Sequence, residues 1–150
     1  MNRCIVYQRR CFAKHCLIEA VDNEDWDAID EFIAQGDYVK DPMFYDWAFE
    51  LTKEDRDDRR DLGVSVLEKS KFEGDDFDRM KRPIYELMIN DSHCYVRYRS
   101  AFCLVNQGVF SENGLKVVNF QRDLERTLNE AKDDDETKDI AIGYLDKLKE

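Results

Sequence analysis

Hydrophobic residues recur every three to four positions along most of this chain, a spacing that places them on one face of an α-helix. Within residues 9–21 the pattern is carried by Phe12, Cys16, Leu17 and Ala20. It predicts further helices over residues 26–34, 42–54, 59–70, 77–90, 91–107 and 115–132, and a last helix that ends near Lys149. Alternation typical of a strand is weak and confined to "CIVYQ" at residues 4–8. The pattern therefore predicts an all-α fold of about eight helices in pairs.

Residues that begin and end helices lie between these segments. Asn23 is expected to cap the second helix and Gly36 to end it, because Asn accepts hydrogen bonds from free amides and glycine tolerates a left-handed turn. Asp41 followed by Pro42 is a strong helix-start signal. Pro83 is expected to kink its helix or to begin it, since proline lacks an amide hydrogen.

Two of the predicted helices carry the same arrangement of residues. The stretch "EDRDDRRDLGVSVL" (54–67) superposes on "DSHCYVRYRSAFCL" (91–104) with an offset of 37 residues. An acid begins each copy, Arg60 aligns with Arg97, and the small residue Gly63 aligns with Ser100. A weaker third copy, "KDDDETKDIAIGYL" (132–145), follows at an offset of 41. A recurring unit of this length indicates an array of stacked helix pairs.

The stretch "PIYELMINDSHCYVRYRSAFCL" (83–104) resembles a HEAT repeat. The resemblance is carried by Pro83 in the first helix, Asp91 in the turn, Arg97 six residues later, and the small pair Ser100-Ala101 ahead of Leu104. It is good over residues 76–108, weaker over 41–70 and 111–150, and absent over 1–36, where "LIEAVDNEDWDAIDEFIAQGDYV" looks like the start of an ankyrin-type array. The resemblance implies an α-solenoid of about four helix pairs, with the first two helices as a degenerate or capping repeat, and protein–protein binding as the usual function.

Physical reasoning gives the repeated residues packing roles. Each helix pair is too small to bury its own apolar face, so neighbouring pairs must stack. Gly63 and the pair Ser100-Ala101 permit close approach of helices, and an arginine one turn into a helix can span to the acid of the neighbouring pair. Arg60 and Arg97 are therefore expected to hold the stack together rather than to bind a ligand.

The charge of the chain is negative and unevenly distributed. Its 150 residues carry a net charge of −11 and are 43% hydrophobic, which fits a single helical-repeat domain over residues 1–150. Nucleic acid is disfavoured as a partner, because phosphate binding requires a basic face. Residues 21–80 contain 20 acids and 8 bases (8 − 20 = −12), whereas residues 1–20 contain four bases and one acid (4 − 1 = +3). An ordinary solvated surface explains this unevenness, and an electrostatic docking face is the functional alternative.

The sequence predicts a cytoplasmic protein. No segment resembles a signal peptide or a membrane span, since the longest uninterrupted apolar run is "AFCLV". Five cysteines, an odd number, indicate reduced thiols. Cys103 lies inside the apolar run and is expected in the core.

Motifs for metal binding or catalysis are weak. Cys11 and His15 lie four residues apart, but zinc takes four ligands and the chain has no Cys-x-x-Cys motif. The neighbours His93 and Cys94 point in diverging directions on a helix, which disfavours a thiol nucleophile with a base. The acidic run 133–136 lacks the glycine of a calcium loop. We expect no metal, no cofactor and no catalytic activity.

An aromatic and arginine patch is the main candidate binding site. If Ser100, Ala101 and Leu104 face the core, the opposite face of the helix carries Tyr95, Tyr98, Arg99 and Phe102. Second helices line the concave surface of a solenoid, where the equivalent positions in the neighbouring copies are carboxylates: Asp58, Asp61, Glu136 and Asp139. Tyrosine and arginine are common binding anchors. The alternative is that the rings pack on adjacent helices while Arg99 pairs with Asp61 or Asp139; the binding face is then expected along the acidic helices between Val21 and Glu31.

These observations predict a non-catalytic protein–protein interaction module that binds a basic peptide or protein on an acidic concave face. One alternative is an acidic inhibitor or immunity-type protein that imitates nucleic acid and blocks a nucleic-acid-binding enzyme. A small enzyme is the third possibility, because a fold alone does not determine function.

Overall fold

The computed structural model describes residues 3–108, 117–130 and 134–149, and the regular secondary structure within them is helical, which confirms the predicted all-α class. These residues form eight helices: α1 (Arg3–Asp22), α2 (Trp26–Gln35), α3 (Pro42–Leu51), α4 (Asp57–Lys69), α5 (Asp78–Asn90), α6 (Cys94–Asn106), α7 (Val117–Glu130) and α8 (Asp135–Lys149). The weak strand pattern at residues 4–8 was misleading, since these residues belong to α1, which begins before residue 9. A strand needs a neighbour for its backbone hydrogen bonds, and the described residues offer none.

The helix boundaries around α3 follow the predicted signals. The Asp41 carboxylate accepts a hydrogen bond from the amide of Met43 at 3.0 Å, and Pro42 is the first residue of α3. Gly36 ends α2 with a φ of 73°, the left-handed conformation that glycine tolerates. Pro83 does not begin its helix but lies inside α5.

The cap of α2 differs from the prediction. Asp25, rather than Asn23, begins the helix and accepts a hydrogen bond from the amide of Ala28 at 3.2 Å. Asn23 instead follows the end of α1, where its amide donates to the carbonyl of Glu19 at 3.0 Å. The aspartate directly before Trp26 therefore takes the capping position.

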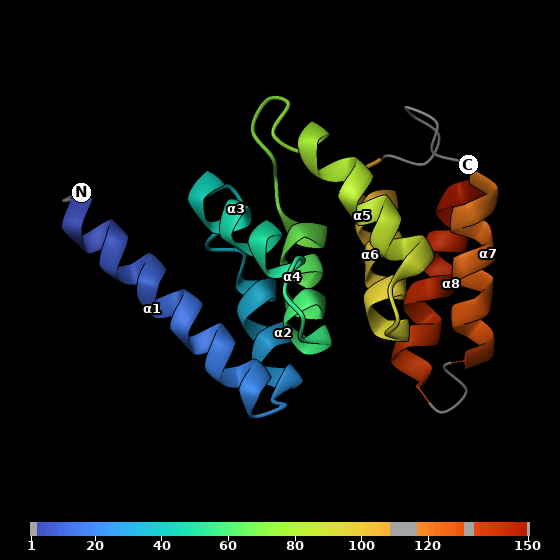
Figure 1. The fold of residues 1–150 in the computed structure, drawn as a ribbon, viewed down its shortest axis with the longest axis horizontal. Helices are drawn as coiled ribbons and strands as arrows, with labels where there is room; N and C mark the ends of the chain where they lie inside the picture. The colour runs from blue at the N-terminus through green and yellow to red at the C-terminus, as the bar shows by residue number, and fades with distance from the viewer. Residues whose placement is uncertain (1–2, 109–116, 131–133, 150) are drawn as a thin grey trace.

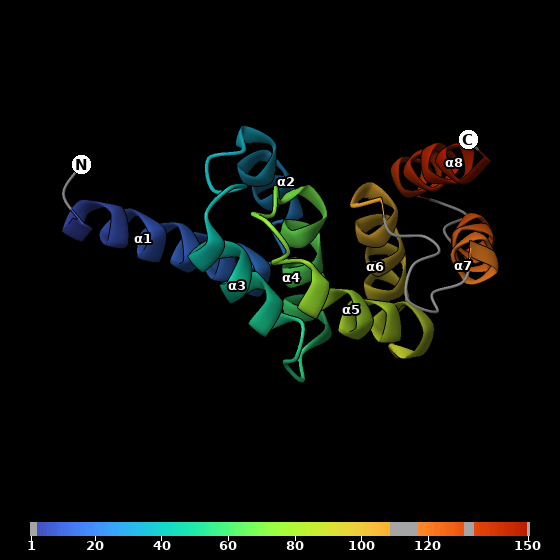
Figure 2. The ribbon, with the colours of Figure 1, turned by 90° about the horizontal axis from the view of Figure 1, so that it is seen from above.

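The chain runs along the long axis of the molecule, from α1 at one end, past α2 to α4 and then α5 and α6, to α7 and α8 at the other end (Figure 1). Helix α4 packs against α3, α6 packs against α5, and α8 packs against α7. Helices α4 and α6 also pack directly on each other, and α6 contacts both α7 and α8. Seen from above, α6 and α8 lie on one side of α5 and α7 (Figure 2).

Gly63 permits the close contact between α3 and α4. A Cβ atom built on Gly63 would lie 2.5 Å from the carbonyl oxygen of Ala48 and 3.1 Å from the Cβ of Leu51. The obstructing atom at 2.5 Å belongs to the backbone of α3, so a side-chain rotation cannot relieve the clash. The prediction that this small residue allows close helix approach is confirmed.

The Arg60 guanidinium joins α4 to the turn between α5 and α6, as predicted. Its Nε and Nη2 atoms donate to the two carboxylate oxygens of Asp91 at 2.9 and 3.1 Å, and the two side chains are 13% and 5% exposed. Its Nη1 also donates to the backbone carbonyls of Glu54 and Asp55 at 3.0 and 2.7 Å. This arginine therefore links three segments through one planar group.

The same arrangement recurs in both directions along the chain. Arg97 donates to the carbonyl of Asp91 at 2.9 Å, six residues before it, as Arg60 does to Glu54. Arg97 also reaches the carboxylate of Glu130 in the next pair, with a longer separation of 3.5 Å. At the other end Arg10 of α1 binds both carboxylate oxygens of Asp41, at 2.7 and 3.2 Å, across the 31 residues that also separate Arg60 from Asp91.

Replacing Gly63 with alanine tests the α3–α4 contact. We expect Gly63→Ala to lower the free energy of unfolding by about 1–3 kcal/mol, because the helices must separate to admit the methyl group. Urea unfolding followed by circular dichroism measures this. Gly143→Ala is the matched control: Gly143 lies in α8, and a Cβ atom added there would meet no atom within 4 Å. The control should be neutral or gain up to about 1 kcal/mol of helix propensity; equal effects of both substitutions would contradict the packing role of Gly63.

Replacing Arg60 with alanine tests the bridge to Asp91. We expect a loss of about 3 kcal/mol in the free energy of unfolding, because Asp91 remains buried without its cation. Arg82→Ala is the control, since Arg82 pairs with Glu86 at 3.1 Å on the surface and should contribute less than about 1 kcal/mol. A double-mutant cycle with Asp91→Ala isolates the coupling. Additive losses would show that the two side chains do not interact.

Candidate functional site

Two aromatic rings of the predicted patch lie in the core, which corrects the expectation that they turn away from it. Tyr98 and Phe102 are 1% and 2% exposed. The prediction assumed that α6 has one buried face, but α6 packs against α4, α5, α7 and α8. A helix in contact with four others has little free surface, so rings on either side of it become buried.

The hydroxyl groups of the two tyrosines hold the last helix pair. Tyr95 donates to the carboxylate of Asp134 at 2.9 Å, and Tyr98 donates to the carboxylate of Glu130. Burial and then the bond to Asp134 raise the pKa of Tyr95 to about 12, and burial and the bond to Glu130 raise the pKa of Tyr98 as well. Asp134 also accepts hydrogen bonds from Thr137 at the start of α8, and these bonds lower its pKa. The tyrosines therefore remain neutral donors that fix α7 and α8 against α6.

Arg99 is the one residue of the predicted patch that combines a charge with access to an open groove in the described structure. Its Nε lies 2.9 Å from a carboxylate oxygen of Asp61 on α4, although the N–H does not point at this oxygen and makes no hydrogen bond. The centre of its guanidinium lies 5.7 Å from the centroid of the Trp26 ring on α2, within the range of a cation–π contact. Arg99 thus connects α2, α4 and α6, and its contact with Asp61 is the one that the alternative packing interpretation predicted.

Asp61 is a buried acid with an altered pKa. Its residue is 6% exposed, and the Ser65 hydroxyl donates to its backbone carbonyl at 2.8 Å. Burial raises the pKa of Asp61 to about 6, while the charges of Arg99 and His93 oppose this shift. The exposed carboxylate of Asp30 on α2 is near enough to raise the pKa further. Desolvation therefore outweighs the attraction of Arg99 at this position.

The other predicted carboxylates do not surround the tyrosines. Asp58 binds Arg56 at the start of α4, with contacts of 2.6 and 3.1 Å. Asp139 is exposed on α8. The side chain of Glu136 lies outside the described residues. The predicted ring of acids around an aromatic patch is thus reduced to the contact between Asp61 and Arg99.

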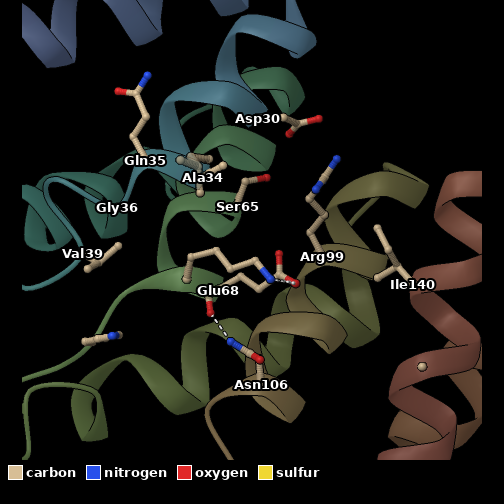
Figure 3. Close-up of a pocket in the computed structure, with 14 residues that line it drawn as sticks. Asp30, Ala34, Gln35, Gly36, Val39, Ser65, Glu68, Arg99, Asn106 and Ile140 are labelled. Atoms are coloured by element: carbon tan, nitrogen blue, oxygen red, sulfur yellow. Dashed lines mark hydrogen bonds and ion pairs between the residues drawn. The ribbon is translucent and has the colours of Figure 1, made fainter.

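A groove of about 860 Å³ crosses the even-numbered helices (Figure 3). Its lining from α2 and α4 comprises Asp30, Ile33, Ala34, Gln35, Ser65, Glu68 and Lys69. Its lining from α6, α8 and the connecting segments comprises Gly36, Val39, Lys71, Arg99, Asn106, Ile140 and Gly143. Figure 3 shows Arg99 extending from α6 toward the side of the groove on which Asp30 lies. Helices α2, α4, α6 and α8 therefore line one groove, and Arg99 is the residue of the predicted patch that belongs to its lining.

The charges of the groove are arranged in two zones. The lining has two acids, Asp30 and Glu68, and three bases, Lys69, Lys71 and Arg99. Exposed acids continue beyond it on both sides. Asp27 and Glu31 flank Asp30 on α2, while Asp139 and Asp146 lie four residues before and three after Gly143, on the same side of α8. The groove therefore has a mixed floor between two acidic rims.

Sequence reasoning missed the contribution of α2 to this groove. Asp30 and Ala34 lie one turn apart, and both are exposed. The acidic segment Val21–Glu31 was the alternative location for a binding face, and Asp30 within it does line the groove. Lys69 and Lys71 could not be predicted as groove residues. They follow the repeated motif at the end of α4, where the path of the chain depends on tertiary packing.

The described residues hold little that resembles a reactive centre. No group of three or more His, Cys, Asp or Glu side chains among them could hold a metal ion. Cys103 lies in the core as predicted, and burial raises the pKa of its thiol. None of the described helices has the length and apolar character needed to cross a membrane.

Comparison with known proteins adds no assignment: the chain matches no protein-family model, no curated protein and no solved structure. The arrangement of its own residues is therefore the basis for inferring its function.

The raised pKa of Asp61 predicts a pH effect on stability. The folded protein binds this proton more readily than the unfolded chain, whose aspartate has a pKa near 3.8, so this contribution grows as pH falls through about 6. We compare the free energy of unfolding of the parent protein with that of Asp61→Asn. The parent should gain about 1 kcal/mol relative to the variant when the pH falls from about 7 to about 5. Urea unfolding at each pH measures it, with exposed Asp139→Asn as the control. A difference that is constant with pH, or that falls, would contradict the assignment.

Proposed function

We propose that the chain is a HEAT-like α-solenoid in which α1 and α2 form the terminal, capping pair. The support is the recurrence of one set of contacts at successive positions. Arg10, Arg60 and Arg97 each reach a carboxylate about thirty residues further along, and Arg60 and Arg97 each bond a carbonyl six residues before. Neighbouring pairs in such an array bury each other's apolar faces and leave one continuous hollow along the second helices.

We further propose that this hollow binds a segment of a partner protein, without catalysis. The observation that carries the proposal is the groove of about 860 Å³ formed jointly by α2, α4, α6 and α8. Its size is within the range of sites that enclose several side chains of a ligand. Ile33, Val39 and Ile140 offer apolar contacts, and the lining also includes the polar side chain of Gln35.

The acidic rims favour a partner segment that is basic overall. Asp27 and Glu31 on one side, and Asp139 and Asp146 on the other, are exposed and make no ion pair with the described residues. Their field would attract a cationic segment and raise its rate of association, an effect that salt weakens. We therefore expect the basic residues of the partner to lie at the rims rather than at the aromatic rings of α6.

Selection from a random peptide library displayed on phage tests this proposal. We expect the protein to enrich peptides rich in Lys and Arg. Their affinity, measured by fluorescence anisotropy, should fall as salt is added. Ala34→Trp should weaken these peptides by about tenfold or more, because Ala34 is exposed and lines the groove, so that the indole occupies it. Ser92→Trp, at an exposed position of the α5–α6 turn outside the groove, is the matched control.

Two outcomes would contradict groove binding. Peptides that bind Ala34→Trp and the parent protein equally would place the contact elsewhere on the acidic surface. Binding of any polycation with the same salt dependence, together with inhibition of a nucleic-acid-binding enzyme, would favour the nucleic-acid-imitating inhibitor instead.

A further inference from the structure

The guanidinium of Arg99 contacts two neighbouring side chains and keeps hydrogen-bond donors without a partner among the described residues. Asp61 and Trp26 contact it on its buried side, through the Nε at 2.9 Å and the ring at 5.7 Å. Neither Nη atom makes a hydrogen bond with the residues that the structure describes. Both Nη atoms are accessible, since neither is among the buried polar atoms that lack a partner. The four N–H bonds of the two Nη atoms therefore remain available on a side chain that lines the groove and that its neighbours restrict.

Such an arrangement favours a planar anion. An arginine that pairs with a carboxylate through both Nη groups, or through Nε and one Nη, makes two parallel hydrogen bonds. Because Asp61 and Trp26 already restrict the side chain, less conformational entropy is lost when the anion binds. Lys71 adds a second cation to the same lining and has no ion pair with the described residues.

The position of these cations contrasts with the rest of the molecule. The chain has a net charge of −11, yet the groove lining has three bases against two acids (3 − 2 = +1). The acids that outnumber them lie at the rims, on α2 and α8. A ligand complementary to both zones carries a negative group at its centre and positive groups on either side.

We propose that Arg99 receives a carboxylate of the bound segment, so that the groove selects an acidic side chain flanked by basic residues. This inference rests on the proposed function, since it assigns the chemistry of the segment that the groove binds. It makes Arg99, which belongs to α6 and contacts α2 and α4, a specificity-determining residue of the groove.

The peptides selected on the parent protein provide the test. We expect them to share one Asp or Glu between basic residues, and we expect its replacement by Asn or Gln to weaken binding to the parent by about tenfold. On Arg99→Gln the same replacement in the peptide should have little effect, because the receptor of the carboxylate is gone. Arg99→Lys, which keeps the charge but loses the planar fork, should be intermediate. Lys71→Gln is the matched control and should retain the full effect. Circular dichroism melts identify any variant that fails to fold.

The outcomes separate this inference from the proposed function. One possible outcome is that Ala34→Trp lowers peptide affinity, while the acidic residue of the peptide contributes equally to binding the parent and both Arg99 variants. This result would overturn the role of Arg99 and leave groove binding intact. An effect of the acid that disappears on Lys71→Gln alone would assign the carboxylate to Lys71 instead. Peptides insensitive to Ala34→Trp would remove the proposed function itself.

Discussion

The buried ion pair between Arg60 and Asp91 is the contact on which the stacking of the helices depends. It joins α4 to the turn that begins α6, and both side chains are largely removed from water, so the pair is stable only while the two helices keep their places. The other end of the same interface is also fixed. The Gln107 amide donates to the backbone carbonyls of Leu67 and Ser70 at the end of α4, at 3.1 and 2.9 Å. Polar groups thus define the register of an interface whose area is mostly apolar.

This register makes α6 the centre of the molecule. It contacts helices before and after it in the sequence, and the rings of Tyr98 and Phe102 fill the space between them. The tyrosine hydroxyls keep their hydrogen bonds through Asp134 and Glu130, so burial of the aromatic residues leaves no unsatisfied hydroxyl group. The edge of α6 that carries Arg99 and Asn106 lies beside open space and forms part of the groove.

The distribution of charge in the groove follows from the cost of removing charges from water. The exposed rims tolerate unpaired carboxylates because water solvates them. Asp61 does not line the groove but is buried beside Arg99, and this burial raises its pKa to about 6. Arg99 is less buried than Asp61, and its two Nη atoms make no hydrogen bond with the described residues. A bound carboxylate would occupy these donors, while the rims attract the basic residues beside it.

The sequence by itself determined the all-α class, the start of α3 at Asp41 and Pro42, the end of α2 at Gly36, and the roles of Gly63 and Arg60. Each depends on short-range geometry or on a motif that repeats, so local patterns were sufficient to predict it. Tertiary structure alone decided that Tyr98 and Phe102 are buried, because a helix pattern does not reveal how many neighbours surround the helix. It also decided that Arg99 faces a groove completed by Asp30 and Ile140. Asp30, Arg99 and Ile140 lie more than forty positions apart in the sequence. Only the packing of α2, α6 and α8 brings them to one surface.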